Sequence, residues 1–444
     1  MSNIKLQTLK GFRDFLPNEA RKRQYAINIL KSVFESYGFE PLETPSLEYE
    51  EILLGKYGQE GDKLMYRFTD RGKRKVALRY DQTVPLARVV AQYGSTGSPQ
   101  SLPMPFKRYQ IQQVFRADNT QKGRFREFLQ CDADIVGSSS LLSDAEAILV
   151  AAKSLEKLGF SSKGGTSNVP ATFDGGGSAS GGKNFKILIN DRNIFSQLVK
   201  QGICEEKEIP VVIRAVDKLK KNGKEAVIKE LVGKGMTQKR ATTTLQCVVV
   251  MQETERLREI FSLLEQAGLK KDKDFAFSPT LARGLDYYTG MTFEVEVDGY
   301  SSGSVCGGGR YDNLIGMFAK KQIPAVGFAF GFDRLMEAMD ELNLFPQDTL
   351  SSTTKVLVTV FSEDLLEKSI EISSRLRSNN INTELYLDEN SKIDKQLKYA
   401  DKKGIPYAII IGPDEASKNM VTLRNMKTRE QKIIPYEELT RNIY

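Results

Sequence analysis

Residues 116–137 decide the fold of this chain, and they read Arg-Ala-Asp-Asn-Thr-Gln-Lys-Gly-Arg-Phe-Arg-Glu-Phe-Leu-Gln-Cys-Asp-Ala-Asp-Ile-Val-Gly. Side chains alternate between the two faces of a strand. After the polar turn at residues 122–123, this alternation places on one face the polar residues Gln130, Asp132 and Asp134. The opposite face carries the apolar residues Leu129, Cys131, Ala133 and Ile135. The pattern predicts a half-buried strand that pairs with residues 110–118 as an antiparallel hairpin.

The polar side of this hairpin carries groups suited to a charged ligand. Arg116 and Asp118 share one face of the first strand, whereas Arg124 and Arg126 lie near the loop. Guanidinium groups bind phosphate, and carboxylates accept hydrogen bonds from an ammonium group. Together with Arg-Gly-Leu-Asp-Tyr-Tyr-Thr-Gly at residues 283–290, these groups indicate a site that holds an amino acid and ATP together, as aminoacyl-adenylate formation requires. The alternative is an ordinary hairpin whose charged face is exposed to water.

The order of residues in the hairpin resembles motif 2 of the class II aminoacyl-tRNA synthetases, and residues 283–288 are similar to the signature of the histidyl-tRNA synthetases. Further segments follow in the order of that family, and the resemblance covers nearly the whole chain. They are the opening segment at residues 11–14, motif 1 at 37–45, the loop that receives the substrate's α-amino group at 78–85, a glycine-rich segment at 307–312 and motif 3 at 327–335.

The resemblance implies an α+β fold: the antiparallel sheet of class II synthetases flanked by helices, a helical insertion, and a C-terminal α/β anticodon-binding domain. We expect the first part of the catalytic core at residues 1–190, the insertion at 191–275, the second part of the core at 276–345 and the anticodon-binding domain at 355–444. Strands and helices alternate in the last of these segments, which by itself predicts a mostly parallel α/β domain.

Local signals mark several elements of the core. Asn18 is expected to cap a helix that runs to residue 37, and Ser143 with Glu146 predicts a capping box at the start of another helix. Residues 65–78 and 292–297 are expected as strands. Residues 161–183 are rich in glycine and serine, which predicts a flexible surface loop that is either natural or introduced by engineering.

The charge and hydropathy of the chain indicate which kinds of partner it can have. The net charge of +7 favours a polyanionic partner, although proteins that bind no nucleic acid also carry such an excess. Between Arg214 and Arg240, nine Lys or Arg residues face three Asp or Glu residues. This segment is either a clasp for the tRNA acceptor stem, as the resemblance implies, or a solvated helical face. No apolar run reaches the length of a membrane helix and residues 1–9 lack a signal-peptide pattern, so we expect a cytoplasmic protein without membrane contact.

The chain contains no histidine, and its four cysteines are far apart in sequence. These facts exclude a Ser-His-Asp triad, a histidine-ligated metal and an imidazole base, and they give no CxxC zinc pattern. Adenylate formation tolerates this because it depends on positioning and charge neutralisation. For the absence of histidine we consider three explanations: synthesis of the protein when histidine is scarce, a bias of the lineage, and deliberate removal.

The resemblance implies a role for each charged residue of the site. Arg116 and Arg283 would neutralise the charge that develops when the carboxylate of histidine attacks the α-phosphate of ATP. Arg124 and Arg334 would hold the β- and γ-phosphates together with Mg²⁺, which binds mainly through ATP rather than through histidine or cysteine ligands. Asp118 would contact the adenine amino group, at a position where the family more often has Glu.

Six further residues would bind histidine through its α-ammonium group or its imidazole ring. They are, for the ammonium group, Asp81, Thr83 and Gln130 and, for the ring, Asp134, Tyr288 and Tyr311. Tyr287 is expected in the core, on the opposite face of a strand. For Gly307, Gly308 and Gly309 we expect a close approach of the backbone to the bound amino acid, and the alternative is a hairpin turn.

The function implied is that of a histidine–tRNA ligase, which activates histidine with ATP to histidyl-adenylate and transfers the acyl group to the 3′ end of histidine tRNA. The implied partners are ATP, L-histidine, the tRNA and a second copy of the chain bound through motif 1. Two alternatives stay open: a catalytically silent paralogue such as the regulatory subunit of ATP phosphoribosyltransferase, and another class II synthetase. The first usually lacks the anticodon-binding domain, and residues 283–288 argue against the second.

Overall fold

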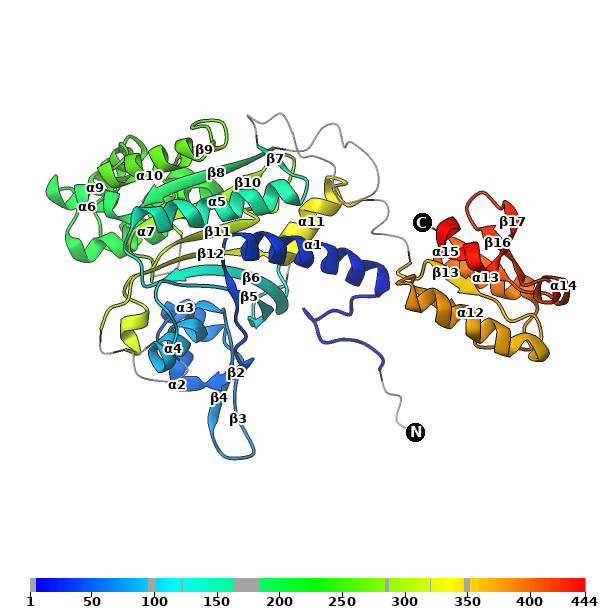
Figure 1. Cartoon of the computed structure of the whole chain (residues 1–444). Helices are drawn as coiled ribbons and strands as arrows, with labels where there is room; N and C mark the ends of the chain where they lie inside the picture. Colours follow the sequence, from blue (N-terminus) through cyan, green and yellow to red (C-terminus); the bar gives the residue numbers. More distant parts are fainter. Residues whose placement is uncertain are drawn as a thin grey trace. The chain divides into compact units, whose positions relative to one another are not determined.

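The structure is a computed structural model of the chain, and it describes residues 5–94, 101–120, 123–162, 184–283, 287–319, 321–346 and 352–443. Apart from its first two residues, the predicted loop at 161–183 lies outside these ranges. The chain divides into two compact units, Met1–Phe345 and Pro346–Tyr444, and each has a hydrophobic core of its own (Figure 1). None of the helices in the described ranges is long and apolar enough to cross a membrane.

A large sheet, with nine strands within the described residues, forms the centre of the first unit (Figure 1). Its antiparallel middle runs in the order β5 (Phe106–Phe115), β6 (Glu127–Val136), β12 (Ala325–Gly331), β11 (Cys306–Arg310), β10 (Met291–Val297) and β8 (Asn184–Asp191). Short parallel partners of β5 or β8 are β1 (Glu40–Pro41), β7 (Ser161–Ser162) and β9 (Phe275–Phe277). The antiparallel sheet expected for the core is therefore confirmed.

Helices bury one face of this sheet. They are α1 (Pro17–Ser36), α5 (Leu141–Lys157), α10 (Glu255–Gln266) and α11 (Phe332–Glu341). Side chains of all four pack in one core with the apolar residues of the sheet, and α1 lies beside α5 (Figure 1). Leu129, Cys131, Ala133 and Ile135 of β6 all belong to this core, as the alternation along the strand predicts. The other side of β6 is thereby left for polar residues.

The two predicted helix caps are wrong. α1 begins at Pro17, because proline fits the first turn of a helix, where its missing N–H is not needed. Asn18 therefore lies inside the helix instead of capping it. α5 is capped by Ser140, whose Oγ accepts a hydrogen bond from a backbone N–H at 3.2 Å. Ser143 is already a buried residue of the helix, so the capping box was placed three residues too late.

A three-stranded sheet precedes the loop at residues 78–85. It runs in the order β2 (Leu47–Tyr49), β4 (Lys75–Leu78) and β3 (Arg67–Thr69), and it is accompanied by α2 (Glu50–Leu53), α3 (Gly58–Lys63) and α4 (Thr83–Tyr93). Residues 65–78, expected as strand, thus form the β3–β4 hairpin. The core of this region includes Tyr80 and Val84, and it also contains Tyr288 and Tyr311 from much later in the chain. The loop at residues 78–85 therefore lies against the end of the large sheet.

A helical cluster follows β8. It comprises α6 (Ser196–Lys200), α7 (Ile209–Val216), α8 (Leu219–Gly233) and α9 (Gln238–Val249), and its hydrophobic core is separate from that of the large sheet. Ala282 also packs in this separate core, one residue before Arg283. The cluster is therefore joined by packing to the segment that enters the site.

The second unit is an α/β domain with a sheet of mixed direction. Its strands run in the order β14 (Thr383–Leu385), β13 (Val356–Val358), β15 (Tyr407–Ile410), β16 (Met420–Asn425) and β17 (Gln431–Pro435). The first three are parallel, as expected, whereas β16 and β17 are antiparallel additions that the sequence analysis missed. The helices are α12 (Leu366–Ser378), α13 (Ile393–Lys403), α14 (Pro413–Ser417) and α15 (Leu439–Ile443).

Candidate active site

A cavity of about 400 Å³ opens on the polar side of β6. Every side chain to which the sequence analysis gave a role in the site lines this one cavity, as does the backbone of Gly307 but not that of Gly308 or Gly309. The side chains come from segments as far apart as the loop before α4 and the first turn of α11. They are Asp81, Thr83, Arg116, Asp118, Arg124, Gln130, Asp134, Arg283, Tyr288, Tyr311 and Arg334. The structure therefore brings all of them together.

The β5–β6 hairpin supplies the floor of the cavity. Its register places Gln112 opposite Gln130 and Arg108 opposite Asp134. Arg116 follows the end of β5, so it belongs to the irregular connection and not to the strand. Its Nε donates to the backbone oxygen of Tyr80 at 3.0 Å, and its guanidinium lies 4.4 Å from the centre of that tyrosine ring. These contacts hold Arg116 over the cavity.

At one end of the cavity, two buried carboxylates share one buried cation. Nη2 of Arg108 lies 2.7 Å from Asp134 and 3.9 Å from Asp132. The hydroxyl of Tyr311 donates to Oδ1 of Asp134, and Gln130 donates to Asp132 at 2.8 Å. Burial raises the pKa of both carboxyl groups, and Arg108 opposes that effect. This end can therefore accept a hydrogen bond or a positive charge from a ligand.

Asp81 forms a second acceptor in the same half of the cavity. Its Oδ1 accepts from the hydroxyl of Tyr57 at 2.9 Å and from the backbone N–H groups of Thr83 and Val84, each at 3.1 Å. Burial raises the pKa of Asp81, while these donors lower it. An ammonium group that enters here would meet a carboxylate whose orientation is already fixed.

Arg283 is held in an unusual backbone conformation. Its φ of 40° lies in the left-handed region, which costs energy for a residue with a side chain. Its Nη1 donates to the backbone oxygen of Phe293 at 3.2 Å and lies 3.6 Å from Glu294. A side chain at Gly307 would collide with it, because a Cβ there would stand 1.5 Å from Nη1. The residues after it, 284–286, lie outside the described ranges.

The structure excludes the alternative for residues 307–309 and adds a place in the cavity wall for Tyr287. Gly307, Gly308 and Gly309 lie in the middle of β11, so the alternative of a hairpin turn is wrong. Tyr287 packs against the core that contains Tyr288 and Tyr311, as expected, and it also lines the cavity. Its ring lies 4.9 Å from that of Tyr288 and 5.9 Å from that of Tyr311. The strand alternation used for Tyr287 does not apply, since β10 begins only at residue 291.

The other end of the cavity is positively charged and more open. Arg334, in the first turn of α11, donates from Nη1 to the backbone oxygen of Ser304 at 3.3 Å. Burial lowers the pKa of Arg334 and the nearby Arg124 lowers it further. Arg124 itself is exposed, and Asp118 is half-buried. Two guanidinium groups that repel each other in this way would gain from a polyanion between them.

Sequence reasoning missed several residues of the cavity wall. Asp132 was placed on the correct face by its spacing from Gln130 and Asp134 but was given no role. Tyr57 and Tyr80 were not singled out, because their contacts with Asp81 and Arg116 are visible only in three dimensions. The period-two spacing was the one signal that could have identified Asp132 as a member of the site.

Two family models match this chain. The histidyl-tRNA synthetase model matches residues 11–163 and 179–335, and the anticodon binding domain model matches residues 355–443. The chain belongs to the histidyl-tRNA synthetase family. Residues 164–178, which separate the two matched parts of the first model, fall within the Gly/Ser-rich segment at 161–183.

Relatives agree with this family over nearly their full length. The histidine–tRNA ligase of Cytophaga hutchinsonii is 38% identical, over 98% of this chain and 98% of its own. That of Wolinella succinogenes is 39% identical, over 96% of this chain and 95% of its own. The solved structure of the histidyl-tRNA synthetase from Nostoc sp. PCC 7120 covers 99% of both chains at 28% identity, with a TM-score of 0.80. The predicted family and fold are therefore confirmed.

Proposed function

We propose that the chain activates L-histidine with ATP in this cavity and transfers the acyl group to the 3′ end of histidine tRNA. The observation that carries the proposal is the division of one cavity into a buried end rich in acceptors and an open end rich in arginine. The first suits an amino acid with an ammonium group and an imidazole ring, and the second suits a triphosphate. As a member of its family, the chain is an ATP-dependent aminoacyl-tRNA ligase.

At the buried end, Asp81, Thr83 and Gln130 bind the α-ammonium group. Asp134, whose position is fixed by Tyr311 and Arg108, accepts the N–H of the imidazole ring. A buried acceptor of this kind discriminates strongly, because a side chain without the donor would leave it unpaired. Tyr288 closes the same end, and Asp132 lies beside it as a further polar group of the wall.

At the open end, arginines bind the phosphates. Arg116 and Arg283 neutralise the charge that develops as the substrate carboxylate attacks the α-phosphate, so they act as catalytic residues. Arg124 and Arg334 hold the β- and γ-phosphates, and Asp118 contacts the adenine amino group. No His/Cys/Asp/Glu cluster in the described part of the chain could cage a metal. Mg²⁺, which favours substrate phosphates together with only one or two carboxylates, would enter mainly as a complex with ATP.

The acyl transfer needs no histidine side chain, because a phosphate oxygen of the adenylate can accept the proton from the tRNA hydroxyl. The helical cluster with Lys220, Lys221 and Lys224 clasps the acceptor stem, and the second unit binds the anticodon. Two copies pair through motif 1 at residues 37–45, and the protein acts in the cytoplasm, where its tRNA is used. With these roles, we keep the expected domain limits, which are 1–190 and 276–345 for the catalytic core, 191–275 for the insertion and 355–444 for the anticodon-binding domain.

Charging of a histidine tRNA transcript with radiolabelled histidine tests the proposal directly. We expect acylation that depends on ATP and Mg²⁺, and none with a transcript specific for another amino acid. A chain that binds histidine but charges no tRNA would instead match the regulatory paralogue. The four arginines of the open end and the match of residues 355–443 to an anticodon binding domain favour the ligase over that alternative.

A further inference from the structure

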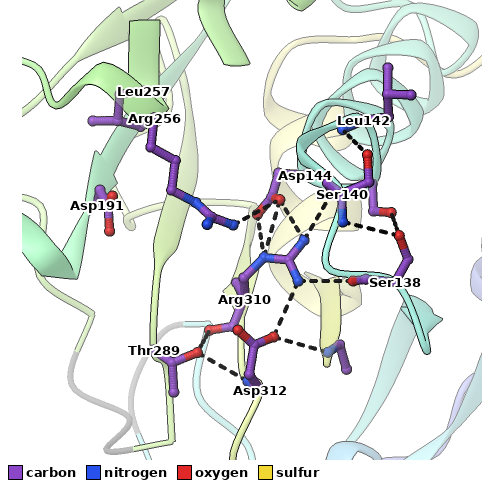
Figure 2. Close-up of polar contacts among 12 residues, drawn as sticks. Ser138, Ser140, Leu142, Asp144, Asp191, Arg256, Leu257, Thr289, Arg310 and Asp312 are labelled. Atoms are coloured by element: carbon purple, nitrogen blue, oxygen red, sulfur yellow. Dashed lines mark hydrogen bonds and ion pairs between the residues drawn. The ribbon is translucent and has the colours of Figure 1, made fainter. Parts of the chain in front are cut away.

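Arg310, at the end of β11, is 1% exposed and forms a network of polar contacts (Figure 2). Its Nε donates to both carboxylate oxygens of Asp144, at 3.0 and 3.1 Å. Its Nη1 donates to the backbone oxygen of Ser138 at 3.0 Å and to Asp312 at 3.2 Å. Its Nη2 donates to the backbone oxygen of Ser140 at 3.2 Å. All three nitrogens of the guanidinium are therefore used inside the protein.

The partners of Arg310 belong to different segments of the chain. Ser138, Ser140 and Asp144 lie in the loop after β6 and the first turn of α5. The backbone oxygen of Arg310 accepts from the N–H of Thr289 at 2.8 Å, and the hydroxyl of Thr289 accepts from the N–H of Asp312 at 3.0 Å. One side chain and its own backbone thus tie the β6–α5 loop, the end of β11 and the segment before β10 into a single unit.

Each of these segments carries a residue of the buried end of the cavity. Tyr311 follows Arg310, Tyr288 precedes Thr289, and Asp134 lies in β6 shortly before the loop that Arg310 binds. Arg310 itself does not line the cavity, whereas all three of those residues do. A shift of the unit would therefore move the two tyrosines relative to Asp134, without any direct change to the ligand-binding groups.

We propose that Arg310, together with Asp144, is a positioning residue for histidine recognition. It fixes the distances between Asp134, Tyr288 and Tyr311, and the inference rests on the histidine-binding roles proposed above. The planar guanidinium is required because its three nitrogens reach the carboxylate and two backbone oxygens from separate positions, whereas all the donors of lysine lie on one nitrogen. Displacements of about 1 Å at a site can cost a factor of about 100 in rate.

Steady-state ATP–pyrophosphate exchange with R310K and D144N tests this role. We expect the KM for histidine to rise about 10-fold or more in both variants, with the KM for ATP little changed. Discrimination between histidine and a ring-methylated histidine should fall, because a loosened end tolerates the extra group. The matched control is R88K, which weakens the partly buried pair of Arg88 and Glu48, 2.6 Å apart and outside the cavity wall. It should lower the Tm and leave both KM values unchanged.

T289V covers the case in which R310K does not fold. It keeps the ion pair and removes only the hydroxyl that accepts from Asp312, so a smaller rise in the KM for histidine is expected. If R310K, D144N and T289V lower the Tm but leave the KM for histidine and the discrimination unchanged, Arg310 is merely structural and the proposal is overturned. D134N in the same assay separates failure of the positioning role from failure of the proposed histidine site. A normal KM for histidine in D134N would refute the histidine site itself.

Discussion

The two ends of the cavity differ in how deeply their side chains are buried and in how fully protein hydrogen bonds hold them. At the amino-acid end, Asp81, Gln130, Asp134 and Tyr311 are all buried and joined to the protein by hydrogen bonds. At the phosphate end, Arg124 is exposed, and Arg116, Asp118 and Arg334 are only half-buried. With the roles proposed above, selection of the side chain would be built into the fold, whereas the phosphate site would be completed by ATP and its cation.

Physical chemistry explains the difference. A small ligand with one distinguishing ring must be recognised by a few buried groups, and buried polar groups must have partners to be tolerated at all. A triphosphate brings several charges, so flexible arginines near the surface can bind it without such prior order.

The largest effect is expected for Arg283, an arginine of the open end to which a catalytic role is proposed above. R283A should reduce histidine-dependent exchange by about 10³-fold, because a positioned charge is lost where negative charge develops. The oligomeric state, measured by light scattering, should stay that of the wild type. Near-normal ATP–pyrophosphate exchange by R283A would show that Arg283 has no catalytic role.

A change at the buried end should affect histidine alone. D134N removes the charged acceptor that Tyr311 and Arg108 hold, and a hydrogen bond to a charged group contributes about 1.5–3 kcal/mol. The KM for histidine should therefore rise about 10- to 100-fold, with the KM for ATP unchanged. An equal rise in both values would show that the ends are not separate.

A change at the open end should give the reverse pattern. R124A removes an exposed charge, so the KM for ATP should rise about 10-fold and the KM for histidine should not change. Because exposed charges are screened by salt, the difference between R124A and wild type should shrink at high ionic strength. The effect of D134N should persist under the same conditions, and a salt-sensitive D134N would contradict the comparison.

A surface outside the cavity should leave both ends intact. Charge reversal at Lys220, Lys221 and Lys224 is expected to raise the KM for tRNA several-fold and to spare exchange, since phosphate contacts determine RNA affinity. Reversal of Lys31, Lys153 and Lys157, which are exposed on α1 and α5, is the control with the same change in charge. If charge reversal lowered ATP–pyrophosphate exchange as much as tRNA charging, the three lysines would affect the cavity and not only the binding of tRNA.

The smallest effect concerns stability and pH. Burial raises the pKa of Asp132, so the folded chain holds that proton more tightly than the unfolded chain does. The free energy of unfolding therefore falls as pH rises from the ordinary carboxyl range near 4 towards the raised pKa. In D132N this group cannot titrate, so the free energy of unfolding does not fall in this way. The gain in Tm, which is the Tm of D132N minus that of the wild type, should therefore be larger at pH 8 than at pH 5. A gain that is the same at both pH values would contradict this origin.

Local periodicity predicted the parts of the site that depend on one strand. The alternation along β6 placed Gln130 and Asp134 in the cavity and Cys131 in the core, and both outcomes are observed. The contacts of Arg108 and Tyr57 could not be predicted, because the first depends on cross-strand register and the second joins Tyr57, just before α3, to Asp81, 24 residues later. The capping errors at α1 and α5 and the missed β16 and β17 have a similar cause: packing and competing signals decide where elements begin.

The most direct test of this account is ATP–pyrophosphate exchange by the purified full chain with each of the twenty amino acids in turn, in the presence of Mg²⁺. A cavity whose buried end selects the side chain predicts exchange with histidine alone. Comparable exchange with another amino acid would contradict the assignment of the buried end, and no exchange despite histidine binding would show that the open end does not carry out adenylation.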